Sequence, residues 1–517
     1  MAEITFGTLT GVRSPASTLA SGDGPMRLLI LGDFSSRRRT AADIAEVRPQ
    51  LVDRDNLDDV IAKHAIVLDN LVADEGIPPV SAAIGSLADF HPDALYERLE
   101  IFASLRQLRR RLTNPNTFAD AAAEVRAWGQ AAASGGAASP SQQPKSSSDV
   151  PEQRPEYSTE GLFDLTLGAT GQRHAADEAT SWRDLIRDLA APYALASTKA
   201  EEAQLTAVVD RAAGETMRAI LRHNRFRRAE LAWRGVEFLT RRLETDESLK
   251  LFVLDAPLAA IADDVTAPGD LSKSTLYRRL VDETVHTPGG KPWGAILLLG
   301  RFDATSHDAD VLGRLAKIAQ AAGAPIIAGA HDHLAGSESL RAQRDPDDWT
   351  WTPVATSAAA WRDLRKLPEA AYVGLALPRL LLRLPYGTRS NPTERFAFEE
   401  LPEELTDAAT RHERLAWGPA AVACGYLLAA AFGASGRNMQ LGDVLDIEEL
   451  PLFVDRIDDE PVAIPCGESL LIDRAAEKLM SLGLMPLVSY RDTDRVRLAG
   501  FRSIRGLQER LAGPWAR

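Results

Sequence analysis

Residues 293–330, "WGAILLLGRFDATSHDADVLGRLAKIAQAAGAPIIAGA", hold two short apolar runs with a helical pattern between them. The runs at 293–302 and 324–330 have the length of buried strands, and the pattern at 310–323 ends on a glycine, as helices commonly do. A strand, a helix and a second strand in this order form a βαβ unit, in which the strands pair in parallel and both faces of the sheet are covered. The stretch therefore predicts an α/β fold.

Apolar runs of the same kind occur on the N-terminal side of this unit. "LKLFVLD" (249–255) and "MRLLILGDFS" (26–35) are typical of buried strands, and "ITFGTLTGV" (4–12) is typical of an extended strand. Apolar residues at steps of three and four predict one helix over 91–114 and a long helical stretch over 205–243. The chain is therefore expected to be mixed α/β (α+β), with at least one βαβ unit.

The composition is that of a soluble globular protein, with 517 residues of which 45% are hydrophobic and 26% charged. Asp and Glu number 73 against 59 Lys and Arg, and the resulting charge of −14 argues against general nucleic-acid binding. The N-terminus lacks the pattern of a secretory signal, and the richest apolar run, 420–434, is shorter than the ~20 residues that span a bilayer. We expect a cytoplasmic protein without membrane insertion, in which Cys424 and Cys466 are buried thiols and not a disulfide.

One segment differs from the rest of the chain in composition. Residues 129–158, "GQAAASGGAASPSQQPKSSSDVPEQRPEYS", are rich in Ser, Ala, Pro, Gln and Gly and almost free of large apolar residues. Such a stretch buries too little surface to offset its ordering entropy, so a flexible linker is expected. The linker divides the chain into a domain at 1–128 and a larger region at 159–517.

Polar residues follow both strands of the βαβ unit. They lie in "FDATSHDAD" (302–310) and "HDH" (331–333), and the candidates for a mixed site of imidazole and carboxylate ligands are Asp303, His307, Asp308, Asp310, His331, Asp332 and His333. A metal-dependent hydrolase using Asp303, His307, His331 and His333 is therefore one hypothesis. The alternative is that these are ordinary loop residues, with Asp308 or Asp310 stabilising the start of the next helix. Because no established metal-ligand spacing or catalytic motif is present, we expect no catalytic residue, no metal and no cofactor.

Six arginines between Arg218 and Arg234 form a basic helix face interleaved with Glu215, Glu230 and Glu237. This mixture of charges favours a solvated or interface surface over a nucleic-acid groove. Trp233 within the same helix is expected to be a core residue that buries its large ring.

The stretch "AYVGLALPRLLLRLPYGTRSNP" (371–392) places two arginines, Arg379 and Arg383, in an apolar run. Buried arginines need carboxylate or carbonyl partners, either within the fold or on a neighbouring subunit, so we predict a structural or interface role for both. The polar loop at 387–391 resembles a phosphate cradle in composition. Pro392 follows it directly, however, and no helix N-terminus follows to hold an anion.

Several stretches, taken in order, resemble the two sheath subunits of the bacterial type VI secretion system. "PMRLLILGDFS", "VDRDNLDDVI" and "SLADFHPDALYERLEIFASLRQLRRRL" resemble the small (TssB/VipA-like) subunit. "ILRHNRFRRAELAWRGVEFL", "YVGLALPRLLLRLPYGTRSNP", "LAWGPAAVA" and "LGLMPLVSYRDTD" resemble the large (TssC/VipB-like) subunit. The resemblance implies a small-subunit domain tethered to a large-subunit α/β core in one chain, a structural protein and not an enzyme.

In that family the two subunits assemble into a contractile, phage-tail-like sheath around an inner tube. The resemblance therefore implies self-assembly or assembly with other sheath subunits, an inner-tube protein as partner, and contacts with baseplate components. It also implies an AAA+ unfoldase that binds a short helix, for which "EGLFDLTLGATG" occupies the matching place, with Leu162, Phe163, Leu165 and Leu167 as apolar anchors.

The resemblance to the large subunit stops at "FRSIRGLQERLAGPWAR", whereas that family's large subunit continues through further helices and interlocking strands. A large subunit truncated at its C-terminus is the resulting expectation. It leaves open a non-contractile cap or baseplate-associated variant of the sheath.

Overall fold

Strand β1 (Met26–Gly32) is an interior strand of a nine-stranded sheet, third from one edge, between β5 (Leu249–Asp255) and β6 (Ala295–Phe302). Both neighbours run parallel to it, with Met26 opposite Leu249 and Leu28 opposite Ala295. The computed structural model describes residues 6–9, 24–72, 80–135, 202–457, 460–506 and 509–515. We call the described residues up to 135 the N-terminal segment and those from 202 onward the C-terminal segment. A strand of the N-terminal segment is thus hydrogen-bonded along both edges to strands of the C-terminal segment.

The strand order in this sheet is β11-β15-β14-β8-β7-β6-β1-β5-β2. The strands from β14 to β5 are parallel, and β2, β15 and β11 pair antiparallel with their neighbours. The remaining bounds are β2 (Gln50–Val52), β7 (Ile326–Ala330), β8 (Val373–Leu377), β11 (Asp446–Ile447), β14 (Leu484–Ser489) and β15 (Val496–Leu498). The predicted βαβ unit is confirmed, because α11 (Ser306–Ala322) joins the parallel pair β6 and β7. Gly323 ends this helix at φ 66°, a conformation that glycine adopts without strain.

Alternate residues of β1 enter two different cores. Leu28 and Ile30 belong to the core under α8 (Asn224–Arg242) and α14 (Ala420–Ser435), whereas Leu29 and Leu31 belong to the core on the other face. That face is covered by α9 (Leu258–Thr266), α10 (Thr275–Tyr277), η5 (Arg278–His286), α11, α12 (Ala355–Lys366) and α15 (Asp473–Ser481). Since successive strand residues point to opposite faces, an almost wholly apolar β1 is what a strand buried on both sides requires.

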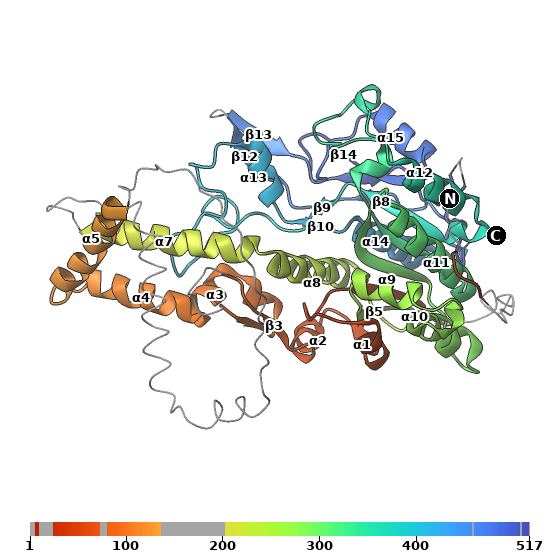
Figure 1. Cartoon of the computed structure of the whole chain (residues 1–517), viewed down its shortest axis with the longest axis horizontal. Helices are drawn as coiled ribbons and strands as arrows, with labels where there is room; N and C mark the ends of the chain where they lie inside the picture. The colour runs from red at the N-terminus through yellow and green to blue at the C-terminus, as the bar shows by residue number, and fades with distance from the viewer. Residues whose placement is uncertain are drawn as a thin grey trace, which may run out of the picture.

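Besides β1, the N-terminal segment supplies the edge strand β2 of the sheet, and from β3 onward the segment extends away from the sheet. Its elements are α1 (Ala41–Glu46), α2 (Leu57–Lys63), β3 (Ile66–Leu68), β4 (Ala82–Ile84), η2 (Leu87–Phe90), α3 (Pro92–Arg98), α4 (Glu100–Leu112) and α5 (Phe118–Gly135). In Figure 1, α7 (Glu202–Arg222) and α8 follow one another along the length of the molecule, with α4 and α5 beside α7 at the end far from the sheet. The N-terminal segment therefore contacts the C-terminal segment both at the sheet and at α7, far from the sheet.

Two helices that the sequence predicts as continuous are broken. The helix over 91–114 is interrupted at Leu99, whose ψ of 132° is extended, and the stretch over 205–243 is interrupted at His223, with ψ 129°. At the first break the guanidinium of Arg106 donates to the Tyr96 carbonyl, which supplies a donor where the helical one is lost. At the second break His223 and Asn224 are both weak helix formers.

The predicted strand at 4–12 is represented by residues 6–9, which make a single bridge, Thr8 to Asp270, in place of a ladder. Phe6 is 6% exposed and lies against α11 at Gly313, where a β-carbon would come within 2.1 Å of its ring. Lys317 donates from Nζ to the carbonyl of Gly7 at 2.6 Å. Residues 6–9 are therefore held on a helix of the C-terminal segment.

Helix α14 is the most apolar helix of the described chain. Residues 420–438 have the length and composition that a membrane span requires, and 56% of that window is buried inside the protein. Its Cys424 is fully buried, as is Cys466, and the two thiols are free. Burial raises the pKa of Cys424 to about 12 and that of Cys466 to about 11, so both are protonated at neutral pH. The prediction of two buried thiols is confirmed.

Smaller pairs complete the C-terminal segment beside the main sheet. These are β9 (Leu380–Leu381) with β10 (Trp417–Gly418), and β12 (Phe453–Ile457) with β13 (Glu460–Ile464), and α13 (Ala408–Arg414) lies between β9 and β10 in the chain. The 371–392 stretch leaves the sheet after β8 and forms β9, which pairs with β10.

Candidate functional site

The carboxylate of Asp255 fixes the end of β1 to the end of β5. It is fully buried and accepts hydrogen bonds from the backbone N–H of Phe34 at 2.9 Å and of Ser35 at 3.2 Å. The Arg39 guanidinium donates to its second oxygen at 2.6 Å. All three donors belong to the N-terminal segment, so this one side chain satisfies buried polar groups on both sides of the junction.

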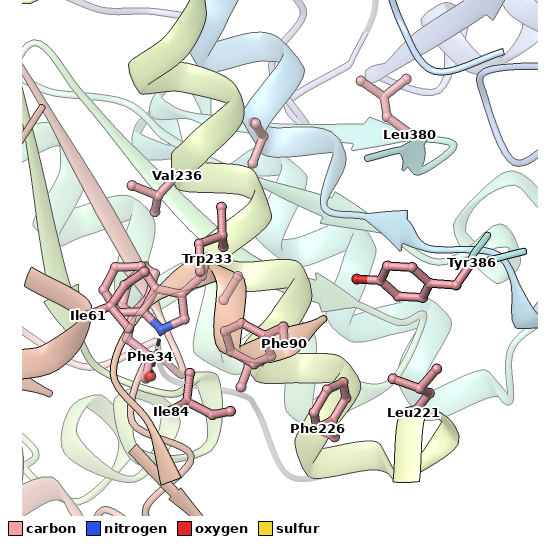
Figure 2. Packing of buried hydrophobic residues seen from close by; sticks show 14 of the residues in the cluster. Phe34, Ile61, Ile84, Phe90, Leu221, Phe226, Trp233, Val236, Leu380 and Tyr386 are labelled. Atoms are coloured by element: carbon pink, nitrogen blue, oxygen red, sulfur yellow. Dashed lines mark hydrogen bonds between the residues drawn. The ribbon is translucent and has the colours of Figure 1, made fainter. Parts of the chain in front are cut away.

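Trp233 of α8, a fully buried side chain, makes apolar contacts at the same junction. Its ring lies 4.9 Å from that of Phe34 and 5.1 Å from that of His64, and its Nε1 donates to the Phe34 carbonyl at 3.0 Å. Two turns earlier in α8, Phe226 packs edge-on against Phe90. Figure 2 shows both contacts between α8 and the N-terminal segment, with the Trp233 hydrogen bond as a dashed line. The prediction of a buried core tryptophan is confirmed.

A second contact joins α3 of the N-terminal segment to the loop after residue 386. The Asp93 carboxylate accepts from the backbone N–H of Glu394 at 2.9 Å and of Arg395 at 3.0 Å. The ring of Tyr96 stacks on Phe396, 4.2 Å apart and nearly parallel. The 371–392 stretch thus leads directly into a loop that binds the N-terminal segment.

Arg383 occupies the centre of this stretch, between two buried carboxylates. Its guanidinium donates to Glu230 at 2.6 Å and to Glu400 at 2.7 Å, and the three side chains are 8%, 2% and 9% exposed. The ring of Tyr386 lies 4.1 Å beneath the guanidinium. Burial alone would raise the pKa of Glu230, but Arg383 and then Arg234 hold that pKa below its ordinary value. The geometry is that of a desolvated ion-pair network within one chain.

Arg379 and the polar loop have partners of their own. Arg379 pairs with Glu468, its Nε donating at 2.8 Å. Within the loop, Thr388 donates from its backbone N–H and its hydroxyl to Glu399, and Gly387 lies so close to the same carboxylate that a β-carbon would come within 2.1 Å of it. A carboxylate of the chain therefore occupies the position that an anion would need in a phosphate cradle.

The basic face of α7 and α8 is directed largely into the protein. Arg225 donates to the carbonyl of Ser36 at 2.8 Å, Arg227 to that of Leu415 at 2.8 Å, and Arg218 to that of Glu399 at 2.8 Å. Since Ser36 belongs to the N-terminal segment, part of this face is an interface between the two segments.

Of the seven candidate metal ligands, the structure brings together three. Ligand atoms of Asp303, His331 and His333 lie within 4.8 Å of one another. The other four residues lie elsewhere or have other partners. His307 is exposed on α11, and Asp310 pairs with Arg314. Asp308 accepts a hydrogen bond from the backbone N–H of Asp303, and Asp332 accepts one from that of Leu340. The four-ligand set on which the hydrolase hypothesis rested, with His307 in it, is therefore not assembled. The segment that carries Leu162, Phe163, Leu165 and Leu167 lies outside the described residues.

Two protein-family models match separate parts of the chain. The model of the VipB tail sheath N-terminal domain matches residues 203–505, and that of the type VI secretion system VipA family matches residues 19–128. The chain belongs to the type VI secretion sheath family. The type VI secretion system sheath protein TssC1 of Pseudomonas aeruginosa is 31% identical over 343 residues, which cover 65% of this chain and 66% of that protein.

The two family matches lie on opposite sides of the junction described above. Phe34 and Asp93 lie in the VipA match, whereas Trp233, Asp255 and Arg383 lie in the VipB match. One polypeptide therefore carries parts that match both sheath-subunit families, and the sheet is built from both parts. The matched families are structural, and nothing in the comparisons supports a metal-dependent hydrolase.

The sequence alone did not single out Asp255 or Asp93. A signal for Asp255 was present, because an acidic residue at the end of an apolar strand is placed to bind the backbone of a neighbouring strand end. The sequence indicated the role of Asp93 less clearly, since an acidic residue in the first turn of a helix usually stabilises the N-terminus of that helix.

Proposed function

We propose that this protein is a structural subunit of a type VI secretion sheath, cytoplasmic and without enzymatic activity. Copies of it, or copies together with other sheath subunits, assemble around an inner tube. The observation that carries the proposal is the position of β1: the small-subunit part supplies an interior strand of the large-subunit sheet, hydrogen-bonded on both edges. A rigid unit of this kind suits a protein that transmits force and performs no chemistry.

We assign a role to each part of the chain as its sequence predicts. Residues 1–128 act as the small-subunit domain, 129–158 as the linker and 159–517 as the large-subunit region. Covalent connection fixes a one-to-one ratio of the two parts and raises their effective concentration. Arg379 and Arg383 hold the large-subunit loops that face the small-subunit part. Leu162, Phe163, Leu165 and Leu167 as an unfoldase-binding helix, and contacts with baseplate components, remain predictions from the family.

Electron microscopy of the purified full chain tests the proposal. Negatively stained samples should contain rings or tubes, either with the protein alone or after the inner-tube protein of the same secretion system is added, because sheath subunits polymerise on that tube. Particles that remain monomeric at high protein concentration in both samples would contradict it. The full chain treated with denaturant and then examined in the same way serves as the blank for non-specific aggregates.

A further inference from the structure

Asp303, His331 and His333 meet at the carboxyl ends of two neighbouring parallel strands. Asp303 directly follows β6, His331 directly follows β7, and His333 lies in the turn η6 (Asp332–Ala335). The backbone N–H of His331 donates to the Phe302 carbonyl at 2.8 Å, which ties the two strand ends together. The three side chains therefore start from a rigid part of the sheet.

The distances between the ligand atoms suit a bound metal ion. Nδ1 of His333 lies 2.9 Å from Oδ1 of Asp303, and Nδ1 of His331 lies 3.7 Å from the same oxygen. In a tetrahedral zinc site with bonds of ~2.0–2.2 Å, neighbouring ligand atoms stand about 3.4 Å apart. The observed separations lie on either side of that value.

A hydrogen bond explains one of these two contacts and not the other. His333 can donate from Nδ1 to the Asp303 carboxylate, whereas Nδ1 of His331 accepts a long hydrogen bond of 3.4 Å from the backbone N–H of His333. Nδ1 of His331 has a single lone pair, which accepts from the His333 N–H, so no hydrogen bond from His331 accounts for its approach to Oδ1 of Asp303. A metal ion bound at Nδ1 of His331 would replace this long hydrogen bond and would attract the Asp303 carboxylate.

The surroundings hold the ligands in place and leave an ion a way in. The His333 ring stacks on Trp351 at 4.1 Å with an interplanar angle of 6°. Its other nitrogen, Nε2, lies 3.7 Å from the carboxylate of the exposed Glu338, beyond hydrogen-bond distance but close enough for a favourable charge interaction. The three ligand side chains are between 22% and 36% exposed.

We propose that Asp303, His331 and His333 form a binding site for a divalent transition metal, with zinc the ion best suited to two imidazoles and one carboxylate. A water molecule completes the coordination. The ion cross-links the ends of β6 and β7 and fixes the turn that follows β7, so its role is structural. The site is independent of the sheath function proposed above, since neither depends on the other.

Zinc titration of the untagged full chain, treated with chelator and then dialysed, tests the site by calorimetry. The wild type should bind one equivalent, and His331→Ala and His333→Ala should each weaken binding by about 100-fold or more, because each removes a ligand. His286→Ala is the matched control: His286 lies 2.9 Å from Asp282 in a pair of the same kind, and its loss should leave zinc binding unchanged. Cobalt(II) should give the visible absorption of a four-coordinate site in the wild type and not in the two ligand variants.

Two results would overturn the proposal. One is a wild-type chain that takes up no zinc under these conditions. The other is uptake that His331→Ala and His333→Ala leave unchanged, which would place the ion elsewhere. Circular dichroism of each variant, compared with the wild type, shows whether the variant is folded. Asp303→Asn is a third ligand variant, which keeps the size of the side chain.

Discussion

Replacing Arg383 by methionine should lower the free energy of unfolding by about 3–5 kcal/mol, because it removes the guanidinium that donates to two buried carboxylates, leaving Glu230 only the more distant Arg234. Glu230 and Glu400 are 2% and 9% exposed, so water does not replace the lost guanidinium. Lysine should rescue only part of the loss, since an ammonium group cannot donate to both carboxylates in the planar geometry of arginine. Urea unfolding of the full chain, followed by circular dichroism, measures the difference.

Arg389→Met is the matched control for this substitution. Arg389 lies in the same stretch but is 65% exposed and stands 3.6 Å from an exposed Glu403, so its loss should change the free energy by less than about 0.5 kcal/mol. Adding Glu230→Gln and Glu400→Gln to Arg383→Met should restore part of the stability, because no buried charge is then unpaired. An Arg383→Met protein as stable as Arg389→Met would show that the network contributes nothing.

Trp233→Ala should cost about 3–5 kcal/mol, the range for removing a fully buried aromatic side chain. The loss is expected at the junction of the two segments, because the indole contacts Phe34 and His64 and donates to the Phe34 carbonyl. Trp233→Phe keeps most of the ring area and removes only the donor, so about 1–3 kcal/mol is expected from it. The same urea unfolding measurement places the three proteins in order.

Tyr490→Ala serves as the control, since Tyr490 is an aromatic residue that is 40% exposed and lies outside the junction. Its loss should stay within about 0.5 kcal/mol of the wild type. If Trp233→Ala unfolded at the same urea concentration as Tyr490→Ala, the indole would not be a principal contact between the segments.

Apolar runs in the sequence predicted where the buried strands lie, but not that β1 pairs with β5 and β6. An apolar run such as 26–32 shows that a strand is buried on both faces, and β1 is so buried. Its partners, β5 and β6, are far away in the chain, and no periodicity within a run encodes which runs pair. The place of the small-subunit strand in the large-subunit sheet therefore appeared only in the structure.

The same limit applies to the charged groups. Two arginines among apolar residues indicated buried partners, and Arg383 indeed lies between carboxylates, yet Glu230 is on a helix distant in sequence. In the 302–333 cluster, the order of strands predicted that Asp303 and His331 would meet. His307 does not join them, because it lies in the first turn of α11 and is exposed there. The sequence does not show which side of the helix a first-turn residue will face.

The most direct test of the account is whether the two sheath parts stay together when the connection between them is cut. A protease site inserted within residues 140–150 allows the purified full chain to be cleaved, and size-exclusion chromatography then reports the state of the fragments. We predict that both fragments elute together at the volume of the uncut chain, because β1 is hydrogen-bonded between β5 and β6. Two folded fragments that elute separately would contradict a shared sheet.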